Sequence, residues 1–555
     1  MMHKKLMTAA IVLFSSLALA AQTVKVRGVV LDDTGAPLTG AYVLIKGTTT
    51  GTSADIDGNF TLDAKPGQTL EFQFMGYETL SLTVPENGKE LKVHMLPDSN
   101  NVLQEAVTIA YGTVRKEDLT GSVTNVKMGD IKDSPVLSVD QALQGRIAGA
   151  DIMTTTGEPG SSSSIRIRGT RSINASNEPL IVVDGVMDAV SDLGDLNPSD
   201  IESMTVLKDA SSTAIYGSRG SNGVIIITTK QGEEGRESKP RITFKAEAGI
   251  SRLPAGLDLM NAAEYAQYRN DVAYFSSDNT GAKEGAILNN YTYPDPLSKG
   301  EGTDWIKAIT RTAVTQNYNL SVGGGDKKGS YYVSLGYNNT QGIIKNSGVE
   351  RYSGRLNLDK QLFSWLKIGY KGSFTLRDQD RNLASIGGTS TRAAIYLSPL
   401  RQLYDSIDDD YDAVTYNPPT MTILLNTYQT RRIANNHSGY LEITPIKDLV
   451  LRSQNTYFGY QEHWYRYYPG TLPAKRDGDG GDAWRREYDS QTLSTENTIT
   501  YKWKASKHRF DVLTGFTGQT FVSNDFQLSG SGYMEDDVKW NNMGSVIDNL
   551  SFASS

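Results

Sequence analysis

Residues 330–338 read Ser-Tyr-Tyr-Val-Ser-Leu-Gly-Tyr-Asn, and their alternation indicates the fold class of most of the chain. Every odd position holds a large apolar or aromatic side chain, and the even positions hold small or polar residues except for Tyr332. A period of two places these two sets on opposite faces of a β-strand. The same pattern recurs near residues 313–322, 366–377, 488–503 and 508–522. A β-barrel between lipid and water requires this pattern, and a soluble antiparallel sheet also fits it.

The lengths of the connections separate these two alternatives. We predict nine strands, near residues 239–250, 313–322, 330–341, 350–358, 366–377, 430–443, 449–463, 488–503 and 508–522. Long connections (251–312, 342–349, 378–429 and 464–487) then alternate with tight ones (323–329, 359–365, 444–448 and 504–507). Outer-membrane barrels alternate long outer loops with short periplasmic turns, whereas a soluble sandwich has no reason to do so. Residues 239–555 are therefore predicted to form the first part of an antiparallel transmembrane β-barrel.

Nine strands are too few to enclose a folded domain. Barrels with a plugged lumen have about 22 strands. The last segment, residues 551–555, shows no strand pattern. We therefore expect the sequence to be the N-terminal part of a longer transporter, truncated in this sequence or in the gene.

Residues 1–20 are predicted to be a signal peptide. Lys4 and Lys5 precede an apolar run, and Ala-Leu-Ala at 18–20 provides a cleavage pattern of small residues. The apolar run falls short of the ~20 residues that a helix needs to span a bilayer. The chain is therefore expected to be exported.

Composition removes several functional classes. The 555 residues include 55 Lys and Arg, 63 Asp and Glu, and no Cys, for a formal net charge of −8. Without Cys there is no thiol nucleophile and no Cys-ligated metal, and a net negative chain is a poor partner for nucleic acid. Neither His-Glu-x-x-His nor Gly-x-Ser-x-Gly occurs. We expect no enzyme activity and no cofactor.

Residues 23–97 are predicted to form a small β-sandwich of about seven short strands separated by turns. Asp55, Asp57 and Gly58 are better turn formers than calcium ligands, because Ala64 stands where an EF-hand would place its bidentate Glu. The segment resembles the carboxypeptidase-regulatory-like domain. The residues that support this resemblance are 27–30, 37–41, 47–48, 57–60 and 76–77.

Residues 98–113 are predicted to be a linker that contains one short strand. The hexad Glu105, Ala106, Val107, Thr108, Ile109 and Ala110 is β-prone and flanked by polar sequence. Such a segment can pair edge-on with another protein's sheet through its backbone. On these residues alone, one more strand of a local sheet is the better interpretation.

Residues 114–231 contain a series of blocks in a fixed order. The blocks are residues 142–149, 164–169, 179–186, 196–203, 206–211, 214–220 and 222–230. In sequence and spacing they resemble the plug of the SusC/RagA family of TonB-dependent outer-membrane transporters. The resemblance implies an α+β plug domain here. It also implies that residues 105–110 are a TonB-box-like segment, although Ala106 and Ala110 depart from the family pattern and leave the pairing register open.

The plug-motif residues that the resemblance selects are Arg166, Arg168, Gly169, Asp184, Gly185, Lys208, Asp209, Tyr216, Gly217, Arg219 and Gly223. The alternation of Ile165, Arg166, Ile167 and Arg168 predicts that both guanidiniums lie on one face of a strand. That face suits either a water-lined lumen or an exposed edge strand. Gly217 and Gly223 are expected at tight turns before the apolar run 224–227.

An aromatic run lies at the predicted outer end of the seventh strand. Trp464, Tyr465, Tyr467 and Tyr468 could stack on sugar rings or peptide side chains. The alternative is the interfacial aromatic girdle of a barrel, and alternation assigns about half of these side chains to it.

The resemblance implies TonB-dependent import of oligosaccharides across the outer membrane, together with TonB and a SusD-like surface lipoprotein. Two alternatives remain open: a peptide importer of the RagA type, and a truncated surface-binding protein that does not transport.

Overall fold

The computed structural model places the chain in two compact units, which are described separately. It describes residues 24–32, 35–48, 50–74, 77–85, 90–96, 106–109, 112–115, 123–128, 138–154, 156–174, 176–190, 192–232, 238–254, 258–276, 293–381, 394–401, 423–472, 480–505, 508–545 and 548–554. The predicted signal peptide lies outside these residues. None of the helices in this described part is long and apolar enough to cross a bilayer.

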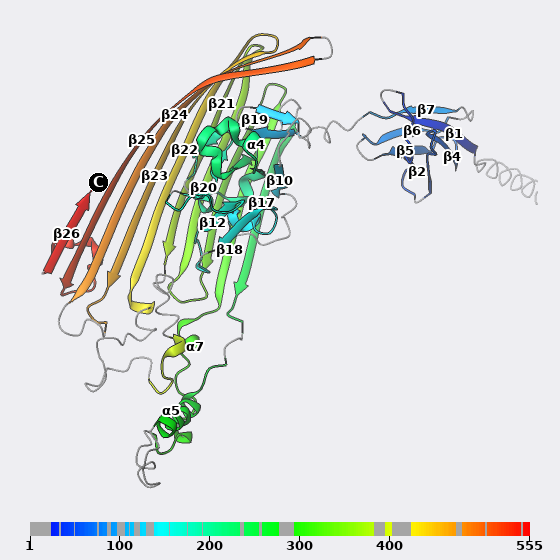
Figure 1. The fold of residues 1–555 in the computed structure, drawn as a ribbon. Coiled ribbons are helices and arrows are strands. Elements are labelled where there is room, and N and C mark those ends of the chain that lie inside the picture. The colour runs from blue at the N-terminus through cyan, green and yellow to red at the C-terminus, as the bar shows by residue number, and fades with distance from the viewer. Residues whose placement is uncertain are drawn as a thin grey trace, which may run out of the picture. The chain divides into compact units, whose positions relative to one another are not determined.

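The first unit contains the predicted sandwich of seven short strands (Figure 1). One sheet has the order β4(Asn59–Ala64), β1(Val24–Leu31), β7(Leu91–His94), and the other has the order β3(Gly51–Ser53), β2(Tyr42–Ile45), β5(Thr69–Gln73), β6(Leu80–Thr83). Along β4 every second residue is buried, so one face of the strand enters the core. There Phe60 meets Phe72 edge to face, with ring centroids 5.4 Å apart.

The second unit begins with a plug domain built on a mixed five-stranded sheet. The sheet order is β10(Val123–Lys127), β15(Ile201–Leu207), β16(Val224–Thr229), β13(Leu180–Val183), β14(Val186–Met187). Its helices are α3(Val139–Leu143), α4(Ala210–Thr213), η4(Leu193–Asp195), η5(Pro198–Asp200) and η6(Ala214–Asn222). The central strand β16 has buried side chains on both faces, which explains its continuous apolar run.

A separate hairpin, β11(Ala150–Thr154) with β12(Ser163–Ile167), completes the plug. Ile165 and Ile167 are buried, as their alternation predicts. The prediction for the arginines is wrong in one respect, because β12 ends at Ile167 and Arg168 follows it with a φ of 57°. The backbone turns at Arg168, so the two guanidiniums do not share one strand face.

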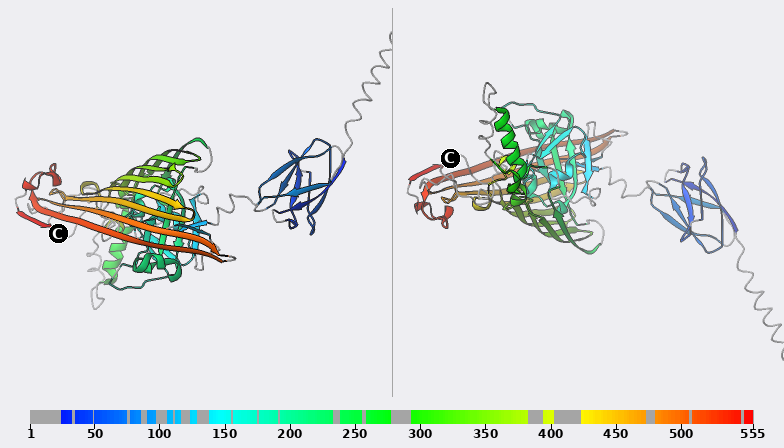
Figure 2. Two further views of the ribbon diagram at one scale, coloured as in Figure 1. Left: turned by 90° about the horizontal axis from the view of Figure 1, so that it is seen from above. Right: turned by 90° about the horizontal axis from the view of Figure 1, so that it is seen from below.

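The rest of the unit is a single antiparallel sheet of ten described strands in chain order (Figures 1 and 2). They are β17(Ser238–Ser251), β18(Ala313–Asp326), β19(Gly329–Gln341), β20(Gly348–Phe363), β21(Leu366–Asp380), β22(Thr427–Ile446), β23(Leu449–Tyr468), β24(Gly481–Ala505), β25(His508–Tyr533) and β26(Asp548–Ser554). The nine predicted strands are all present. The prediction that residues 551–555 have no strand is wrong, because Phe526 pairs with Ser554 and Leu528 with Phe552. Short polar residues hid the alternation there.

The alternation of connection lengths is confirmed. Four turns of two residues each join β18 to β19, β20 to β21, β22 to β23 and β24 to β25. The opposite ends bear the long connections, which include α5(Ala262–Ser276), η7(Leu297–Lys299), α7(Trp305–Ile309), η11(Lys539–Asn541) and η12(Met543–Ser545).

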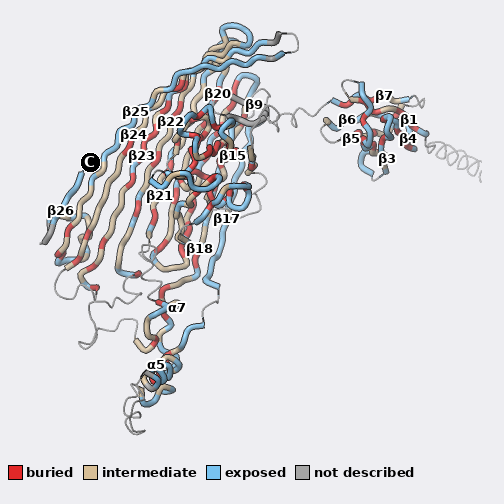
Figure 3. Tube along the Cα trace, in the orientation of Figure 1, coloured by how far each residue is buried: buried red, intermediate tan, exposed pale blue. Residues whose placement is uncertain are grey.

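The two faces of the large sheet have opposite chemistry. Leu335 and Phe374, on the face turned away from the plug, are 62% and 44% exposed. The other face curves around the plug (Figure 2), and buried residues recur along the strands there (Figure 3). The buried polar side chains on that face include Asn319, Arg355 and Asn357. Exposed apolar and buried polar faces are what a strand between lipid and a polar lumen requires.

Candidate functional site at the plug and barrel wall

One of the plug segments that meet the sheet is residues 192–200, which we name the anchor loop. It contains η4 and η5, between β14 and β15. Asp192 caps η4 by accepting a hydrogen bond from the Gly194 N–H at 2.8 Å. Asn197 caps η5 by accepting one from the Ser199 N–H at 3.0 Å, and Pro198 occupies the first position of that turn. The caps fix the loop, so that its polar groups face the sheet.

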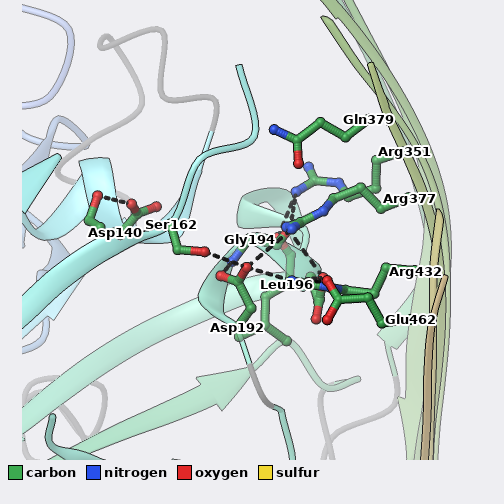
Figure 4. Close-up of polar contacts among 12 residues, drawn as sticks. Asp140, Ser162, Asp192, Gly194, Leu196, Arg351, Arg377, Gln379, Arg432 and Glu462 are labelled. Carbon is green, nitrogen blue, oxygen red and sulfur yellow. Dashed lines mark hydrogen bonds and ion pairs between the residues drawn. The ribbon is translucent and has the colours of Figure 1, made fainter. Parts of the chain in front are cut away.

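Asp192 is the centre of an ion-pair network with the sheet (Figure 4). Its Oδ2 lies 2.6 Å from Arg432 Nη1 on β22 and 3.2 Å from Arg377 Nη2 on β21. Arg432 also pairs with Glu462 on β23 at 2.6 Å. Burial disfavours the charged carboxylate, but the two guanidiniums outweigh it and hold the pKa of Asp192 well below its usual value.

Asp195, three residues further on, faces the same two arginines, but its pKa is shifted in the opposite direction. Its Oδ1 is 3.4 Å from Arg377 and 3.6 Å from Arg432, and neither carboxylate oxygen has a hydrogen-bond partner among the described residues. The side chain is buried, with Asp192 and Glu462 close by, so burial and like charge raise the pKa of Asp195. We attribute the difference to hydrogen bonds, which Asp192 has and Asp195 lacks.

Hydrogen bonds to uncharged groups of the anchor loop complete its attachment. Arg351 on β20 donates to the carbonyl oxygens of Gly194 and Leu196 at 2.9 and 3.0 Å. The Asn197 amide donates to Asn319 Oδ1 on β18 at 2.7 Å. These contacts are polar, whereas the apolar core of the plug is formed by the plug's own residues.

A second buried contact surrounds Asp184, one of the predicted plug-motif residues. Asp184 and Gly185 form the turn between β13 and β14 with φ values of 52° and 87°. The Asp184 carboxylate accepts hydrogen bonds from the Thr229 N–H at 2.9 Å and the Thr229 hydroxyl at 2.6 Å. Arg355 and Lys371 of the sheet lie 3.7 and 3.8 Å away. Burial opposes the charge, but Lys371 and Arg355 prevail, and the pKa of Asp184 is lowered.

The other plug-motif residues stabilise the plug itself. Arg168 pairs with Asp209 at 2.5 Å, and the Lys208 ammonium donates to the Ala148 carbonyl oxygen at 2.6 Å. Arg219 pairs with Asp188 and also donates to Gln519 of β25.

Two glycines of the motif have backbones that disfavour other residues. Gly217 has a φ of 60° and Gly223 a φ of 90°. A Cβ on Gly223 would lie 2.8 Å from Ile167 Cδ1, whereas one on Gly217 would meet open space. The remaining motif residues, Arg166, Gly169 and Tyr216, lie in or beside β12 and η6.

Of the predicted TonB-box-like segment, residues 105–110, the structure describes residues 106–109. Residues 106–109 form β8(Ala106–Ile109), which joins β9(Gly112–Arg115) in a two-stranded sheet. Glu105 and Ala110 lie outside the described residues.

The four aromatic candidates on β23 divide between the two faces of the sheet. Trp464 and Tyr468 share the parity of Glu462, which faces the plug, and Trp464 stacks on Trp484 at 6.4 Å. Tyr465 and Tyr467 lie on the other face. Tyr465 stacks on Trp540 at 5.2 Å. Tyr467 is fully buried, and its hydroxyl donates to Asp536 at 2.8 Å, so no ring face is free for a ligand.

Sequence reasoning singled out residues 196–203 as a plug block, but neither Asp192 nor the partners of the anchor loop on the sheet. Asp192, Arg377, Arg432 and Glu462 come from four separate segments, so no local motif unites them. A signal was present in the strands, because Arg351, Arg355 and Arg377 stand at positions opposite in parity to the exposed apolar residues.

Comparisons with known proteins agree with this geometry. The TonB-dependent Receptor Plug Domain profile matches residues 115–224, and the CarboxypepD_reg-like domain profile matches residues 26–109. The chain is similar to TonB-dependent receptor P26 of Formosa agariphila, with 36% identity over 92% of this chain and 50% of that protein. It is similar to TonB-dependent receptor SusC of Bacteroides thetaiotaomicron, with 38% identity over 71% of this chain and 38% of that one.

Among solved structures, the chain is similar to the RagAB peptide importer in its open–open state. The TM-score is 0.66 at 27% identity, over 81% of this chain and 53% of that one. The chain thus spans about half or less of the length of the relatives it matches.

A plug held by polar groups against the inner face of an antiparallel membrane sheet defines a TonB-dependent receptor of the outer membrane. The matched domains and relatives give the family: the chain belongs to the SusC/RagA family of TonB-dependent receptors.

Proposed function

We propose that this protein takes part in TonB-dependent import of oligosaccharides across the outer membrane, with TonB and a SusD-like surface lipoprotein as partners. The observation that carries the proposal is the character of the plug attachment. The anchor loop meets the sheet through ion pairs and hydrogen bonds, while the apolar core lies inside the plug.

A polar attachment suits a plug that must move. Water can replace each broken hydrogen bond, so the net contribution of a typical one is only about 0.5–1.5 kcal/mol. Separating two apolar surfaces would instead cost free energy in proportion to the area exposed. A pulling force can therefore detach the anchor loop while the plug's own core stays folded.

The pulling site in this proposal is the segment of residues 105–110. A short strand joined to a linker can pair with an added strand through its backbone, whatever its exact side chains. Substrate binding on the outer side would make the segment accessible, and TonB would pair with it and transmit the energy of the proton gradient. No cofactor enters this mechanism.

Deletion of residues 105–110 tests the proposal. We expect loss of oligosaccharide uptake by whole cells while binding of the same oligosaccharide at the cell surface persists. A deletion of residues 98–101 in the same linker is the matched control and should leave uptake intact. Uptake that continues without residues 105–110 would contradict the assignment of the segment.

Energy dependence separates transport from surface binding. Collapse of the proton gradient should abolish uptake, whereas a protein that only binds its ligand would retain the same amount of ligand before and after collapse. A peptide is the second candidate substrate, because the chain is similar to the RagAB peptide importer at a TM-score of 0.66. Competition between labelled oligosaccharides and peptides for uptake distinguishes the two.

A further inference from the structure

Five side chains on the plug-facing face of β22, β23 and β24 form a compact group near the long connections. We name this group the aromatic–arginine patch: Tyr428, Trp464, Arg466, Tyr468 and Trp484. Arg466 lies between two strands that each place an aromatic residue directly opposite it, Tyr428 on β22 and Trp484 on β24. Its position in the sheet therefore makes Arg466 the centre of the patch.

Aromatic faces surround the Arg466 guanidinium. Its Cζ lies 4.8 Å from the ring centroid of Trp484, 5.9 Å from that of Tyr428 and 6.0 Å from that of Tyr468. Such cation–π contacts hold the cation in place without neutralising its charge. The stack of Trp464 on Trp484, at an interplanar angle of 16°, extends the flat apolar surface beside it.

Arg466 differs from its neighbours on the same face in having no carboxylate. Arg381 pairs with Glu158 of the plug at 3.4 Å, and Arg486 donates to Asp525 at 2.8 Å. Among the described residues no ion pair is formed by Arg466, and its Nε is buried without a hydrogen-bond acceptor. Asp482 has the same facing and lies across from Tyr468.

A guanidinium held among aromatic rings without a carboxylate keeps an uncompensated charge, and an anionic oxygen group on a ligand can pair with it. The planar fork of arginine matches the two oxygens of a carboxylate or a sulfate ester. Arg381 and Arg486 lie over two of the patch rings, 5.2 Å from the centroid of Tyr428 and 4.2 Å from that of Trp464. Tyr468 and Trp484 therefore offer the surface for a ring with an apolar face. A sugar ring that bears an acidic group satisfies both features at once.

We propose that the aromatic–arginine patch is a binding subsite for acidic oligosaccharides, in which Arg466 pairs with a carboxylate or sulfate group of one sugar. The proposal deepens the import function above and rests on it. The patch lies four residues along β23 from Glu462, or about 13 Å at the usual rise of a strand. A ligand there would therefore lie close to the anchor loop.

The test is equilibrium binding to the full-length receptor in detergent. The probes are oligogalacturonate, chondroitin sulfate oligosaccharides, a neutral oligosaccharide of equal length and an acidic peptide. We expect at least one acidic oligosaccharide to bind more tightly than the neutral one. Arg466→Gln should reduce that affinity about tenfold or more, the value of one charge-assisted contact, and leave the neutral affinity unchanged. The affinity of Arg466→Lys for the acidic oligosaccharide should lie between those of the wild type and Arg466→Gln, because lysine keeps the charge but lacks the planar, bidentate guanidinium.

Arg485→Gln is the matched control. Arg485 lies on the opposite face of β24, over Tyr465, and pairs with Glu487, so its removal should not alter the preference. If the preference for acidic over neutral oligosaccharides survived Arg466→Gln, the proposal would be overturned. It would also be overturned if the receptor bound only the acidic peptide, or if it bound neither of the two acidic oligosaccharides. Chondroitin sulfate carries carboxylates as well as sulfates, so comparing it with its desulfated form, which keeps the carboxylates, distinguishes a sulfate from a carboxylate. Binding in detergent needs no TonB, so failure here is separate from failure of the import function.

Discussion

Two aspartates of the anchor loop, only three residues apart, should respond in opposite ways to the same substitution. Asp192→Asn removes a carboxylate that faces Arg432 at 2.6 Å and Arg377 at 3.2 Å, while Asn still accepts from the Gly194 N–H. Removing one member of a buried ion pair costs about 3–5 kcal/mol. Asp195 and Glu462 remain near the two arginines and partly compensate for the loss, so we expect a smaller cost, about 2–3 kcal/mol.

Asp195→Asn should have no such cost. The Asp195 carboxylate is buried without hydrogen bonds from the described residues, and its pKa is raised, so its ionised form opposes attachment near neutral pH. Neutralising it is expected to leave the attachment unchanged or to stabilise it, because the substitution removes a buried charge whose pKa is raised.

Hydrogen exchange of the anchor-loop amides measures both effects. A loss of 2–3 kcal/mol in the free energy of local opening makes exchange about 30- to 150-fold faster in Asp192→Asn. Exchange in Asp195→Asn should equal the wild-type rate or be slower. Equal acceleration in both variants would refute the reasoning, because it would mean that hydrogen bonding does not distinguish the two carboxylates.

Three further predictions concern the plug and the sheet. Gly223→Ala should destabilise the plug by about 2–4 kcal/mol in urea unfolding, because the cost of a positive φ and the cost of the contact with Ile167 Cδ1 add together. Gly217→Ala should cost only about 1–2 kcal/mol, because its positive φ is the only penalty. An equal loss of unfolding free energy in the two variants would contradict this. Leu335→Arg places a charge on the exposed apolar face and should lower the free energy of unfolding in a bilayer by about 2–4 kcal/mol if the residue lies at mid-membrane depth, while Leu335→Phe should be tolerated. If Leu335→Arg left the free energy of unfolding unchanged, that face would be in contact with water. Because the pKa of Asp184 is lowered, its contribution to stability is present above about pH 4 and is lost as the pH falls through the lowered value. The Thr229 amide, which donates to this carboxylate, should therefore exchange faster in acid, relative to an unfolded reference. This pH dependence should be absent from Asp184→Asn.

The sequence predicted the elements whose burial follows a short period. Strand β19 could be placed from residues 330–341 because lipid and lumen impose opposite demands on alternate side chains. Strand β26 was missed, since Ser551, Ala553 and Ser554 give no contrast between its two faces. Its pairing with β25 comes from backbone hydrogen bonds, which need no particular side chain.

The candidate site was predictable only in part. Asp184 and Arg219 stand in ordered plug motifs, and both contact the sheet. Asp192 and Arg432 are 240 positions apart, and neither lies in a motif that would connect them. Their contact depends on the way the sheet bends around the plug, which a one-dimensional pattern does not encode.

A reversible crosslink between plug and sheet is the most direct test of the central claim, that the anchor loop leaves the wall during import. The 555 residues contain no cysteine, so a pair can be introduced cleanly. A Cβ at Gly336 of β19 would touch the side-chain amide nitrogen of Asn197, so we choose Asn197→Cys and Gly336→Cys as the pair to crosslink. We expect the oxidised double variant to bind substrate without importing it and to regain uptake when reduced, with each single variant as control. Import at the wild-type rate by the fully crosslinked receptor would contradict the claim.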